Sequence, residues 1–473
     1  MKRYTSLQSI QADLQAGQLT CRTLVEYYLQ NIEKLNGQLN AFLSVYDQEA
    51  LQKANEIDQK IANGTAGKLA GMVVGIKDLL CYKDHPSQGG SRILTGFKSQ
   101  FTATAVQRII DADAIIIGRQ NCDEFGMGSS NENSAFGPAF NAADLSRVAG
   151  GSSGGSAVAV QADFCLASLG TDTGGSIRLP ASFCGVLGLK PTYSRVSRWG
   201  LKAYGSSFDT IGPITHSAED AALLLEVIAG ADEFDSTVSQ REVPSYINLL
   251  ENNNKRWKIA YIRDALDEGL QPEVREQTYT ALKRLEEAGH TVEAIDFPLI
   301  KYFLPTYYIL TTAEVSSNLS RLDGVKYGYR STESVDLESL YKKSRSEGFG
   351  DEAKRRIMLG TFVLSASYYD AYYTKAQRVR RLIKEQTEQI LTEYDFLVSP
   401  ACATTAFKVG AKSEDPLQMY LTDLFTVQAN VVGLPAISIP NGTDQQGLPI
   451  GFQAMAGAFR EADLLQLAQQ LMK

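Results

Sequence analysis

Gly-Gly-Ser-Ser-Gly-Gly-Ser at residues 150–156 and Gly-Thr-Asp-Thr-Gly-Gly-Ser-Ile-Arg at residues 170–178 predict most about the fold and chemistry of this chain. The two motifs place Ser152 and Ser176 in glycine-rich turns, 24 residues apart. Upstream, Lys77 ends the run Val-Gly-Ile-Lys. Two hydroxyls held in tight turns, together with one lysine, can form a hydrolytic site that needs no histidine.

The glycine-rich region from residue 125 to residue 200 has two interpretations. A flexible linker is one, because glycine and serine dominate linkers. Apolar segments interrupt the glycines, however, at residues 158–160 and 164–169. Such segments belong in a folded core, so we expect these glycines to allow a close approach of the backbone to a substrate.

A lysine can activate a serine only when its amine is neutral, and its ordinary pKa of about 10.4 leaves little neutral amine at pH 7. Burial lowers that pKa, and the apolar residues 72–74 and 76 before Lys77 favour a buried strand end. We expect Ser152 to pass a proton between the Ser176 hydroxyl and Lys77. The turn at residues 173–176 can direct several backbone N–H groups to one point and so form an oxyanion hole. Asp172 and Arg178 are expected to brace this turn rather than to react.

Two other motif interpretations are weaker. Residues 150–154 match the G-x-S-x-G turn of α/β-hydrolases, which requires an acid and then a histidine downstream. The chain has only three histidines, and none lies in a glycine-serine motif: His85, His216 and His290. A phosphate-binding loop is not indicated, because neither G-x-x-x-x-G-K-[ST] nor G-x-G-x-x-G occurs.

Composition narrows the classes of function. The 473 residues are 44% hydrophobic and 21% charged, which is typical of a globular protein, and the net charge is −8. This charge argues against a broad nucleic-acid-binding face, although basic clusters occur at residues 354–356 and 378–381. The six cysteines are scattered without metal-ligand spacing, so we expect neither a metal site nor disulfides. No membrane span is expected either, and these features together predict a soluble cytoplasmic protein.

Hydrophobic periodicity predicts an α/β fold in one large layered body. Its central sheet is expected to be mixed and mostly parallel, with helices on both faces. We expect a helical N-terminal part at about 1–65, a catalytic core at about 66–230 and a second α/β portion at about 256–473. Glycines at positions 17 and 37 are expected to stop helices. Predicted helices lie at 5–62, 102–111, 217–230, 272–288, 352–394 and 460–472, and predicted strands at 69–77, 114–118, 257–262, 291–295, 396–399 and 436–439, with a surface connection at 231–256.

The three residues and their surrounding motifs closely resemble the amidase signature family. That resemblance implies a Ser–cis-Ser–Lys triad in which Ser176 is the acyl-enzyme nucleophile. Ser152 would be the bridging serine after a cis peptide bond, and Lys77 would be the base. The same resemblance implies that the oxyanion hole consists of four backbone amides: those of Thr173, Gly174, Gly175 and Ser176.

Within the family, the chain resembles the glutamine-hydrolysing A subunits of tRNA-dependent amidotransferases, through residues 123–137, 189–200 and 354–362. This resemblance implies a heterotrimer with B and C subunits. Glutamine is the small-molecule substrate, and its ammonia is used by the B subunit to amidate Glu-tRNA(Gln), Asp-tRNA(Asn) or both. No cofactor is expected in this chain; ATP and Mg²⁺ would bind the B subunit, and tRNA would bind mainly through that partner.

The same resemblance implies where glutamine is held. A guanidinium can bind a carboxylate through two hydrogen bonds, and a fixed carboxylate can hold an ammonium group. Arg356 is therefore expected at the glutamine carboxylate and Asp423 at its ammonium group, with Tyr307 and Met127 in the same substrate-binding site.

Two alternatives stay open. A free-standing amidase with the same chemistry would act on another carboxamide, and Arg356 together with Asp423 argues against it. A non-catalytic scaffold or RNA-binding subunit is a different class of protein. The intact set of Lys77, Ser152 and Ser176 and the acidic composition argue against that class.

Overall fold

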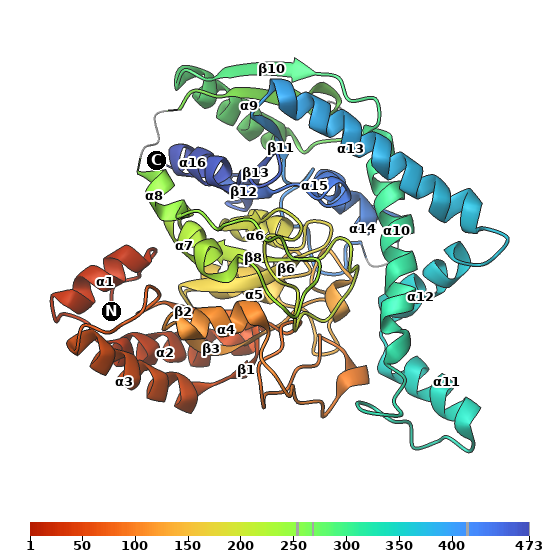
Figure 1. The fold of residues 1–473 in the computed structure, drawn as a ribbon, viewed down its shortest axis with the longest axis horizontal. Coiled ribbons are helices and arrows are strands. Elements are labelled where there is room, and N and C mark those ends of the chain that lie inside the picture. The colour runs from red at the N-terminus through yellow and green to blue at the C-terminus, as the bar shows by residue number, and fades with distance from the viewer. Residues whose placement is uncertain (252–254, 267–268, 413–415, 473) are drawn as a thin grey trace.

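An eleven-stranded sheet runs through the chain from its N-terminal to its C-terminal third (Figure 1). The computed structural model describes residues 1–473 except 252–254, 267–268, 413–415 and 473. Across the sheet the order of strands is β1-β3-β2-β6-β8-β7-β12-β13-β11-β9-β10. In chain order they are β1 (Phe42–Val45), β2 (Val73–Lys77), β3 (Ile115–Gln120), β6 (Ala167–Asp172), β7 (Leu187–Lys190), β8 (Thr210–Thr215), β9 (Lys258–Ile262), β10 (Thr291–Ile295), β11 (Phe396–Pro400), β12 (Ala436–Thr443) and β13 (Pro449–Ala456). A separate pair, β4 (Phe140–Asn141) and β5 (Asp144–Val148), forms a small ribbon.

The sheet is mixed, as predicted, but the prediction that it is mostly parallel is wrong. Only the pairs β3–β2, β2–β6, β11–β9 and β9–β10 are parallel. The other six neighbouring pairs in the described part of the sheet are antiparallel. Strands β12 and β13 are joined by a short turn, and such a turn can connect only antiparallel neighbours. The parallel pairs lie toward the two ends of the sheet. At both ends the sequence predicted a strand, a helix and a second strand in succession, at 69–118 and at 257–295.

Apolar runs explain the parallel strands. Val73, Val74 and Ile76 in β2 are completely buried, and residues 115–117 in β3 are buried as well. Parallel strands covered on both faces are typically apolar along their whole length, whereas half-exposed strands alternate. The predicted strand at 69–77 is confirmed from Val73 onward, since residues 69–71 form a turn, and the predicted strand at 114–118 is confirmed as Ile115–Gln120; Lys77 is the last residue of β2.

The N-terminal part departs from its prediction in two ways. It contains helices α1 (Leu7–Gln15), α2 (Cys21–Leu39) and α3 (Asp47–Ala62), but β1 lies between the last two and pairs with β3. Gly17 follows the first helix with a positive φ of 68°, as expected for a stop. Gly37 instead lies inside α2, which ends at Leu39 because Asn40 takes the left-handed conformation.

Helices flank the sheet in packed groups (Figure 1). In one group, the helices contact one another and neighbouring strands of the sheet. This group consists of α4 (Thr104–Asp111), α7 (Ala218–Ile228), α8 (Tyr246–Leu250) and α16 (Glu461–Leu471). The helix α8 lies in the segment 231–256 that was predicted as a surface connection. A second group forms the right-hand side of Figure 1, and consists of α10 (Phe303–Asn318), α12 (Asp351–Val363), α13 (Lys375–Glu393) and α15 (Val427–Val432).

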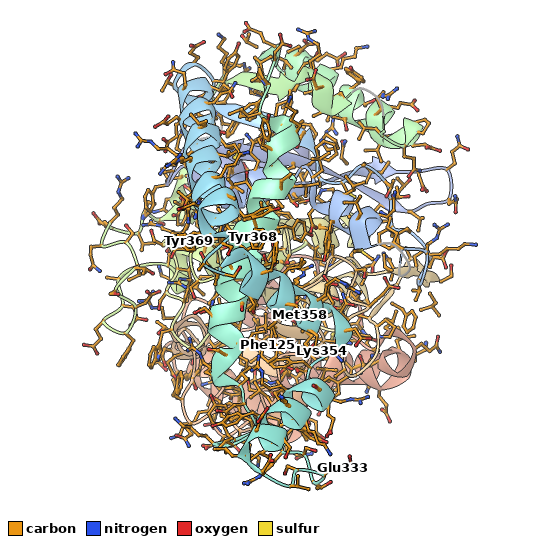
Figure 2. All side chains as sticks on the ribbon, turned by 90° about the vertical axis from the view of Figure 1, so that its right-hand side faces the viewer. Phe125, Glu333, Lys354, Met358, Tyr368 and Tyr369 are labelled. Atoms are coloured by element: carbon orange, nitrogen blue, oxygen red, sulfur yellow. The ribbon has the colours of Figure 1, made fainter. Side chains whose placement is uncertain are left out.

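The predicted helical zone at 352–394 is two helices joined through a π-helical turn, Asp370–Thr374. Figure 2 shows Lys354 and Met358 along α12, and Tyr368 and Tyr369 in the segment that follows it. The remaining helices are α5 (Gly154–Gln161), α6 (Arg178–Cys184), α9 (Pro272–Glu287), α11 (Leu337–Gly348) and α14 (Pro416–Tyr420).

Strands β2 and β6 position the serine motifs. They are parallel neighbours, with Ile76 opposite Leu169, so their carboxyl ends meet at the same edge of the sheet. Lys77 therefore ends β2 close to Thr171 near the end of β6. Helix α5 begins at Gly154, inside the first serine motif and two residues after Ser152.

Candidate active site

Lys77 is completely buried, and its amine contacts three hydroxyl groups. It donates to Ser152 Oγ at 2.7 Å, to Ser153 Oγ at 2.8 Å and to Thr171 Oγ1 at 2.8 Å. The sequence prediction included the first contact but neither of the others. Ser153 follows Ser152 in the same motif, whereas Thr171 comes from the adjacent strand and needs the pairing of β2 with β6.

Burial lowers the pKa of Lys77 from 10.5 to about 8, although Cys122, Asp123, Asp172 and Asp209 act in the opposite direction. A lysine with this pKa carries a neutral amine in about one tenth of the molecules at pH 7, far more than an ordinary lysine does. The amine can therefore accept a proton from a neighbouring hydroxyl, as a general base must.

Ser152 follows a cis peptide bond, Gly151–Ser152, which is the bond expected from the family resemblance. Its hydroxyl is completely buried, and so is that of Ser153. Ser176 is 8% exposed, so it is the one of these serines that a substrate can reach. The two motifs are joined by a backbone hydrogen bond of 3.0 Å from the Ser153 amide to the Ser176 carbonyl.

The predicted proton relay is formed only at its first step. Lys77 contacts Ser152, but no hydrogen bond joins the hydroxyls of Ser152 and Ser176 in the described part of the chain. Catalytic hydrogen bonds often become short only when substrate is bound. The role of Ser152 as the bridge to Ser176 thus stays a prediction.

Three backbone amides around Ser176 are available to a ligand. The amides of Thr173, Gly174 and Ser176 donate no hydrogen bond within the described residues, whereas the Gly175 amide donates to Asp172 Oδ1 at 2.9 Å. Gly175 has a φ of 130°, and a Cβ on it would lie 2.2 Å from Thr426 Oγ1. Only glycine fits this position, and the turn depends on it.

Asp172 and Arg178 brace the turn, as their positions in the motif predicted. Arg178 donates to both carboxylate oxygens of Asp172, at 3.1 and 3.0 Å. Burial favours a raised pKa for Asp172, but Arg178 outweighs this effect and lowers the pKa to about 2. Arg178 also donates to the carbonyl of Thr426, which joins the turn to the segment that carries Asp423.

Arg356 and Asp423 lie beside the same tyrosine. Arg356, on α12, stacks over the ring of Tyr308 at 5.3 Å. The Tyr308 hydroxyl donates to Asp423 at 2.7 Å, and Ser129 donates to the same oxygen at 2.8 Å. Burial raises the pKa of Asp423 to about 6. The tertiary structure thus brings together a guanidinium and a carboxylate that are 67 residues apart in the sequence.

Further partners orient the Arg356 guanidinium. It donates to Glu352 Oε1 at 2.7 Å and to the Tyr204 hydroxyl at 2.7 Å. Its carbon also lies 5.4 Å from the ring centre of Tyr420, which donates to the same Glu352 oxygen at 3.0 Å. Sequence reasoning missed these aromatic residues, because a tyrosine more often fills a core than orients a cation.

Tyr307 and Met127 lie in the aromatic core beside the site. Tyr307 is buried, and a Cβ on Gly174 would lie 2.4 Å from its hydroxyl oxygen, so this ring is against the turn before Ser176. Met127 is completely buried in the same hydrophobic cluster. The described contacts therefore place Tyr307 next to the turn, and Met127 among its neighbouring core residues.

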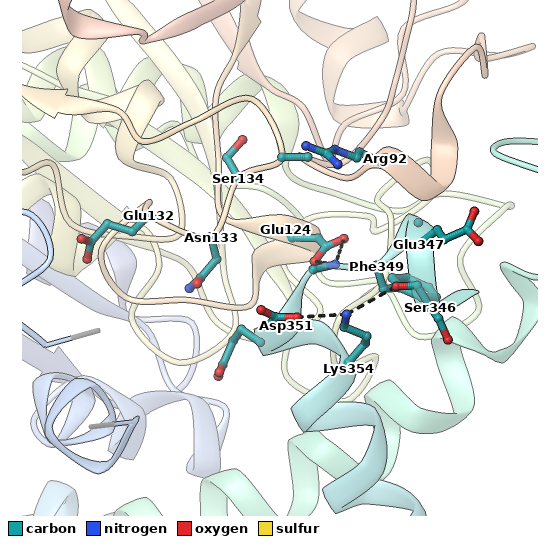
Figure 3. Close-up of a pocket in the computed structure, with 14 residues that line it drawn as sticks. Arg92, Glu124, Glu132, Asn133, Ser134, Ser346, Glu347, Phe349, Asp351 and Lys354 are labelled. Atoms are coloured by element: carbon teal, nitrogen blue, oxygen red, sulfur yellow. Dashed lines mark hydrogen bonds and ion pairs between the residues drawn. The ribbon is translucent and has the colours of Figure 1, made fainter. Parts of the chain in front are cut away.

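A polar pocket of about 460 Å³ has Glu352 among its lining residues, and Figure 3 shows this pocket. Its lining includes Glu124 and Lys354, and Figure 3 shows Lys354 paired with Asp351. None of Lys77, Ser152 and Ser176 is among its lining residues. Because Glu352 also accepts from Arg356, this pocket adjoins the predicted carboxylate-binding residue and not the triad.

No group of three or more His, Cys, Asp or Glu side chains suited to a metal ion occurs among the described residues. The six cysteines are buried and free. Across the described ranges, no helix is both long and apolar enough to cross a membrane.

The fold and the site describe a class of protein: α/β proteins in which a buried lysine contacts the hydroxyl of a serine that follows a cis peptide bond in a glycine-rich turn. Residues 23–465 match the family model described as Amidase, and the chain belongs to this family. The amidase signature family expected from the serine and lysine motifs is thus confirmed.

Relatives with high identity extend over nearly the whole chain. A Cyanothece protein, named as the A subunit of glutamyl-tRNA(Gln) amidotransferase, is 50% identical over 98% of this chain and 96% of its own length. A protein of the same name from Chlorobium phaeobacteroides is 47% identical over 99% of each chain. The crystal structure of such a subunit from Thermotoga maritima matches with a TM-score of 0.81 and 39% identity, over 98% of this chain and 93% of that one.

Proposed function

We propose that this chain is the glutamine-hydrolysing A subunit of a tRNA-dependent amidotransferase. Two independent features support the proposal. The curated relatives that carry this name are similar over nearly their full length. The predicted site also combines a buried base and a reachable serine with one cation and one anion for the two charged ends of glutamine.

In the proposed reaction, the Ser176 oxygen attacks the carboxamide carbon of glutamine. The Ser176 proton passes to the Ser152 oxygen, and the Ser152 proton passes to the neutral amine of Lys77. The amides of Thr173, Gly174 and Ser176 hold the resulting oxyanion, and each such donor contributes about 3–4 kcal/mol to the transition state. The amide of Gly175 braces the turn through Asp172 instead.

The tetrahedral intermediate then collapses as the carbon–nitrogen bond breaks. The Lys77 ammonium returns a proton through Ser152 to the leaving nitrogen, which departs as ammonia. A glutamyl ester remains on Ser176. Water attacks this ester with the same relay as its base, and glutamate leaves with the hydroxyl of Ser176 restored.

Recognition of glutamine is assigned to the two charged residues beside Tyr308. Arg356 binds the α-carboxylate and Asp423 binds the α-ammonium group. Tyr307 and Met127 form the wall of the same site. The partners Glu352 and Tyr204 hold the guanidinium in place before the substrate arrives, which reduces the entropy lost on binding.

The remaining parts of the proposal concern other chains. A B subunit would receive the ammonia, bind ATP and Mg²⁺, and amidate a tRNA that carries glutamate, aspartate or both. A small C subunit would complete the heterotrimer in the cytoplasm. This chain itself would need neither a metal nor a nucleotide.

The single structural observation that carries the hydrolytic part of the proposal is the contact of 2.7 Å between the Lys77 amine and the Ser152 hydroxyl in a fully buried site. The direct test measures glutamate formation by the assembled complex with Ser176→Ala. Activity should fall to background while Ser182→Ala, a buried serine in α6, keeps the wild-type rate. Residual turnover in the Ser176→Ala complex well above background would remove Ser176 from its role.

A free-standing amidase is the second candidate. A bacterial aryl acylamidase of the amidase signature family has a TM-score of 0.86 and 25% identity to this chain. Assay of the chain alone and in its complex, with glutamine and with an aryl acylamide, separates the two candidates. Glutamine turnover that needs the partners favours the amidotransferase assignment, and turnover of the aryl amide by the chain alone favours the free amidase.

A further inference from the structure

A second pocket, of about 420 Å³, lies apart from the residues assigned to catalysis. This volume is within the range of about 300–1,000 Å³ that is typical of small-molecule sites. We call it the aromatic pocket. It is lined by Cys81, Leu94, Phe97, Phe101, Phe125, Leu201, Lys202, Ala203, Asn318, Leu319, Arg321, Leu322 and Tyr327.

Most of the walls of the aromatic pocket are apolar. Phe97 and Tyr327 pack against each other with ring centres 5.6 Å apart. Phe125 is fully buried, and four leucines belong to the same lining. Figure 2 shows where Phe125 lies relative to α12. Such walls suit an alkyl chain or an aromatic ring.

The charge of the aromatic pocket is opposite to that of the whole chain. Its charged lining residues are two cations, Lys202 and Arg321, while the full sequence has a net charge of −8. Neither cation has a carboxylate oxygen within 4.0 Å among the described residues, and the nearby Asp78 is paired with Arg119 at 3.4 Å. The pocket thus offers positive charge with no described carboxylate in direct contact, although Asp78 acts on Lys202 from a greater distance.

Lys202 enters the pocket from the polar side. Its amine contacts Ser87 Oγ and lies 4.0 Å from the sulfur of Cys81 and 6.0 Å from the ring centre of Phe97. Burial lowers the pKa of Lys202. An anion at this amine would replace the hydration that burial removes and would hold the ammonium form. Arg321 is exposed, at the end of a short 3₁₀ turn, Leu319–Arg321.

We propose that the aromatic pocket binds an amphipathic monocarboxylate, with its alkyl or aryl body among the phenylalanine and leucine side chains and its carboxylate on Lys202, near Arg321. A cation would be repelled by both charges. A neutral apolar compound would leave the buried ammonium without a counter-ion. Glutamine itself is a poor fit, because its ammonium group and carboxamide would face aromatic rings.

The aromatic pocket adjoins the backbone that supports the candidate active site. Phe125 precedes Gly126, where an added Cβ would lie 3.5 Å from Ser152 Oγ. Lys202 and Ala203 precede Tyr204, which accepts from Arg356 at 2.7 Å. A ligand in the pocket would therefore contact residues directly next to two elements of the predicted site.

Isothermal titration calorimetry of the full chain with decanoate and with 2-naphthoate tests the proposal. Decylamine serves as the probe of opposite charge. At least one carboxylate should bind with one molecule per chain and at least about tenfold more tightly than decylamine, because a charge-assisted hydrogen bond contributes that much. Tighter binding of decanoate would indicate an alkyl ligand, and tighter binding of 2-naphthoate would indicate an aryl ligand.

Lys202→Met keeps an unbranched side chain one atom shorter and removes its charge, and it should weaken binding of the tighter-binding acid by about tenfold. The matched control Lys98→Met changes an exposed lysine outside the pocket and should bind as the wild type does. Leu322→Phe fills part of the pocket while Lys202 keeps its charge, and it should weaken binding of the same acid. This second variant keeps the test decisive if Lys202→Met does not fold.

Fluorescence provides an independent reading of the position of the ligand. Phe101 lines the pocket and stacks on Trp199 at 5.0 Å, and the chain has only two tryptophans. Binding should change the emission of the wild type, and this change should be absent from Trp199→Phe. Equal affinity for decanoate, naphthoate and decylamine, an unchanged affinity in both pocket variants, or no saturable binding of either acid overturns the proposal.

Discussion

The rate of glutamine hydrolysis should rise with pH as the amine of Lys77 loses its proton. Burial lowers the pKa of this amine to about 8. The proposed relay needs the neutral form, because only a free electron pair can accept the Ser152 proton. Protonated enzyme is therefore inactive, and kcat/KM should increase through this pKa.

The expected magnitude follows from the fraction of neutral amine. With a pKa of about 8, this fraction is about 3% at pH 6.5, about 10% at pH 7 and one half at pH 8. The rate should thus rise by roughly 15-fold between pH 6.5 and pH 8. Asp423, whose pKa burial raises to about 6, would add a second loss only at lower pH, since its carboxylate must be ionised to hold the substrate ammonium.

The assay is glutamate formation by the assembled complex, measured by chromatography so that the detection does not depend on pH. Lys77→Met should be inactive at every pH. Lys190 is the necessary control, because burial also lowers its pKa, to about 7. Lys190→Met should leave the midpoint near pH 8. A rate that is constant across this range, or a midpoint that moves in Lys190→Met, would refute the assignment of Lys77 as the base.

Three further results are expected. Arg356→Ala should raise KM for glutamine on the order of 10–100-fold with little change in kcat, because it removes a charged contact made equally in the ground state; an unchanged KM would indicate a different acyl group. Thr171→Val removes a hydroxyl that stabilises the charged form of Lys77, so the midpoint of the pH profile should move to lower pH, and a midpoint at or above the wild-type value would contradict this role. Arg178→Met should lower the free energy of unfolding by about 3–5 kcal/mol in denaturant titrations, because Asp172 would remain buried without its partner. The exposed Arg381→Met is its control, and equal stability of the two variants would show that the buried pair is not needed.

Predictions of the fold succeeded where local pattern is strong. The apolar runs in β2 and β3 were recognised because parallel strands with two covered faces are apolar along their whole length. The direction of pairing was not predictable, and the mostly parallel sheet was wrong. Pairing depends on connections such as the turn between β12 and β13, and β13 itself was not recognised as a strand.

Predictions of the site also succeeded for local motifs and failed for contacts that depend on tertiary structure. The serine motifs and Lys77 were recognised because glycine turns and a buried lysine have a direct chemical meaning. Ser153 lies in the same motif, and yet its contact with Lys77 was missed, because the direction of its side chain depends on the conformation of the turn. Thr171 was missed because its contact requires two strands that are distant in sequence to become neighbours.

The amino-acid sequence by itself determined the chemical groups that this protein can use: two serines in glycine turns, a lysine after an apolar run, and few histidines. Tertiary structure alone decided which atoms meet. It buries Lys77 among three hydroxyls, and the loss of water there lowers the pKa of the amine to about 8. It also brings Arg356 and Asp423 to one tyrosine, because the packing of α12 on α10 joins segments that the sequence keeps far apart. Local patterns identify reactive groups, but the electrostatic environment that makes them reactive arises only from long-range packing.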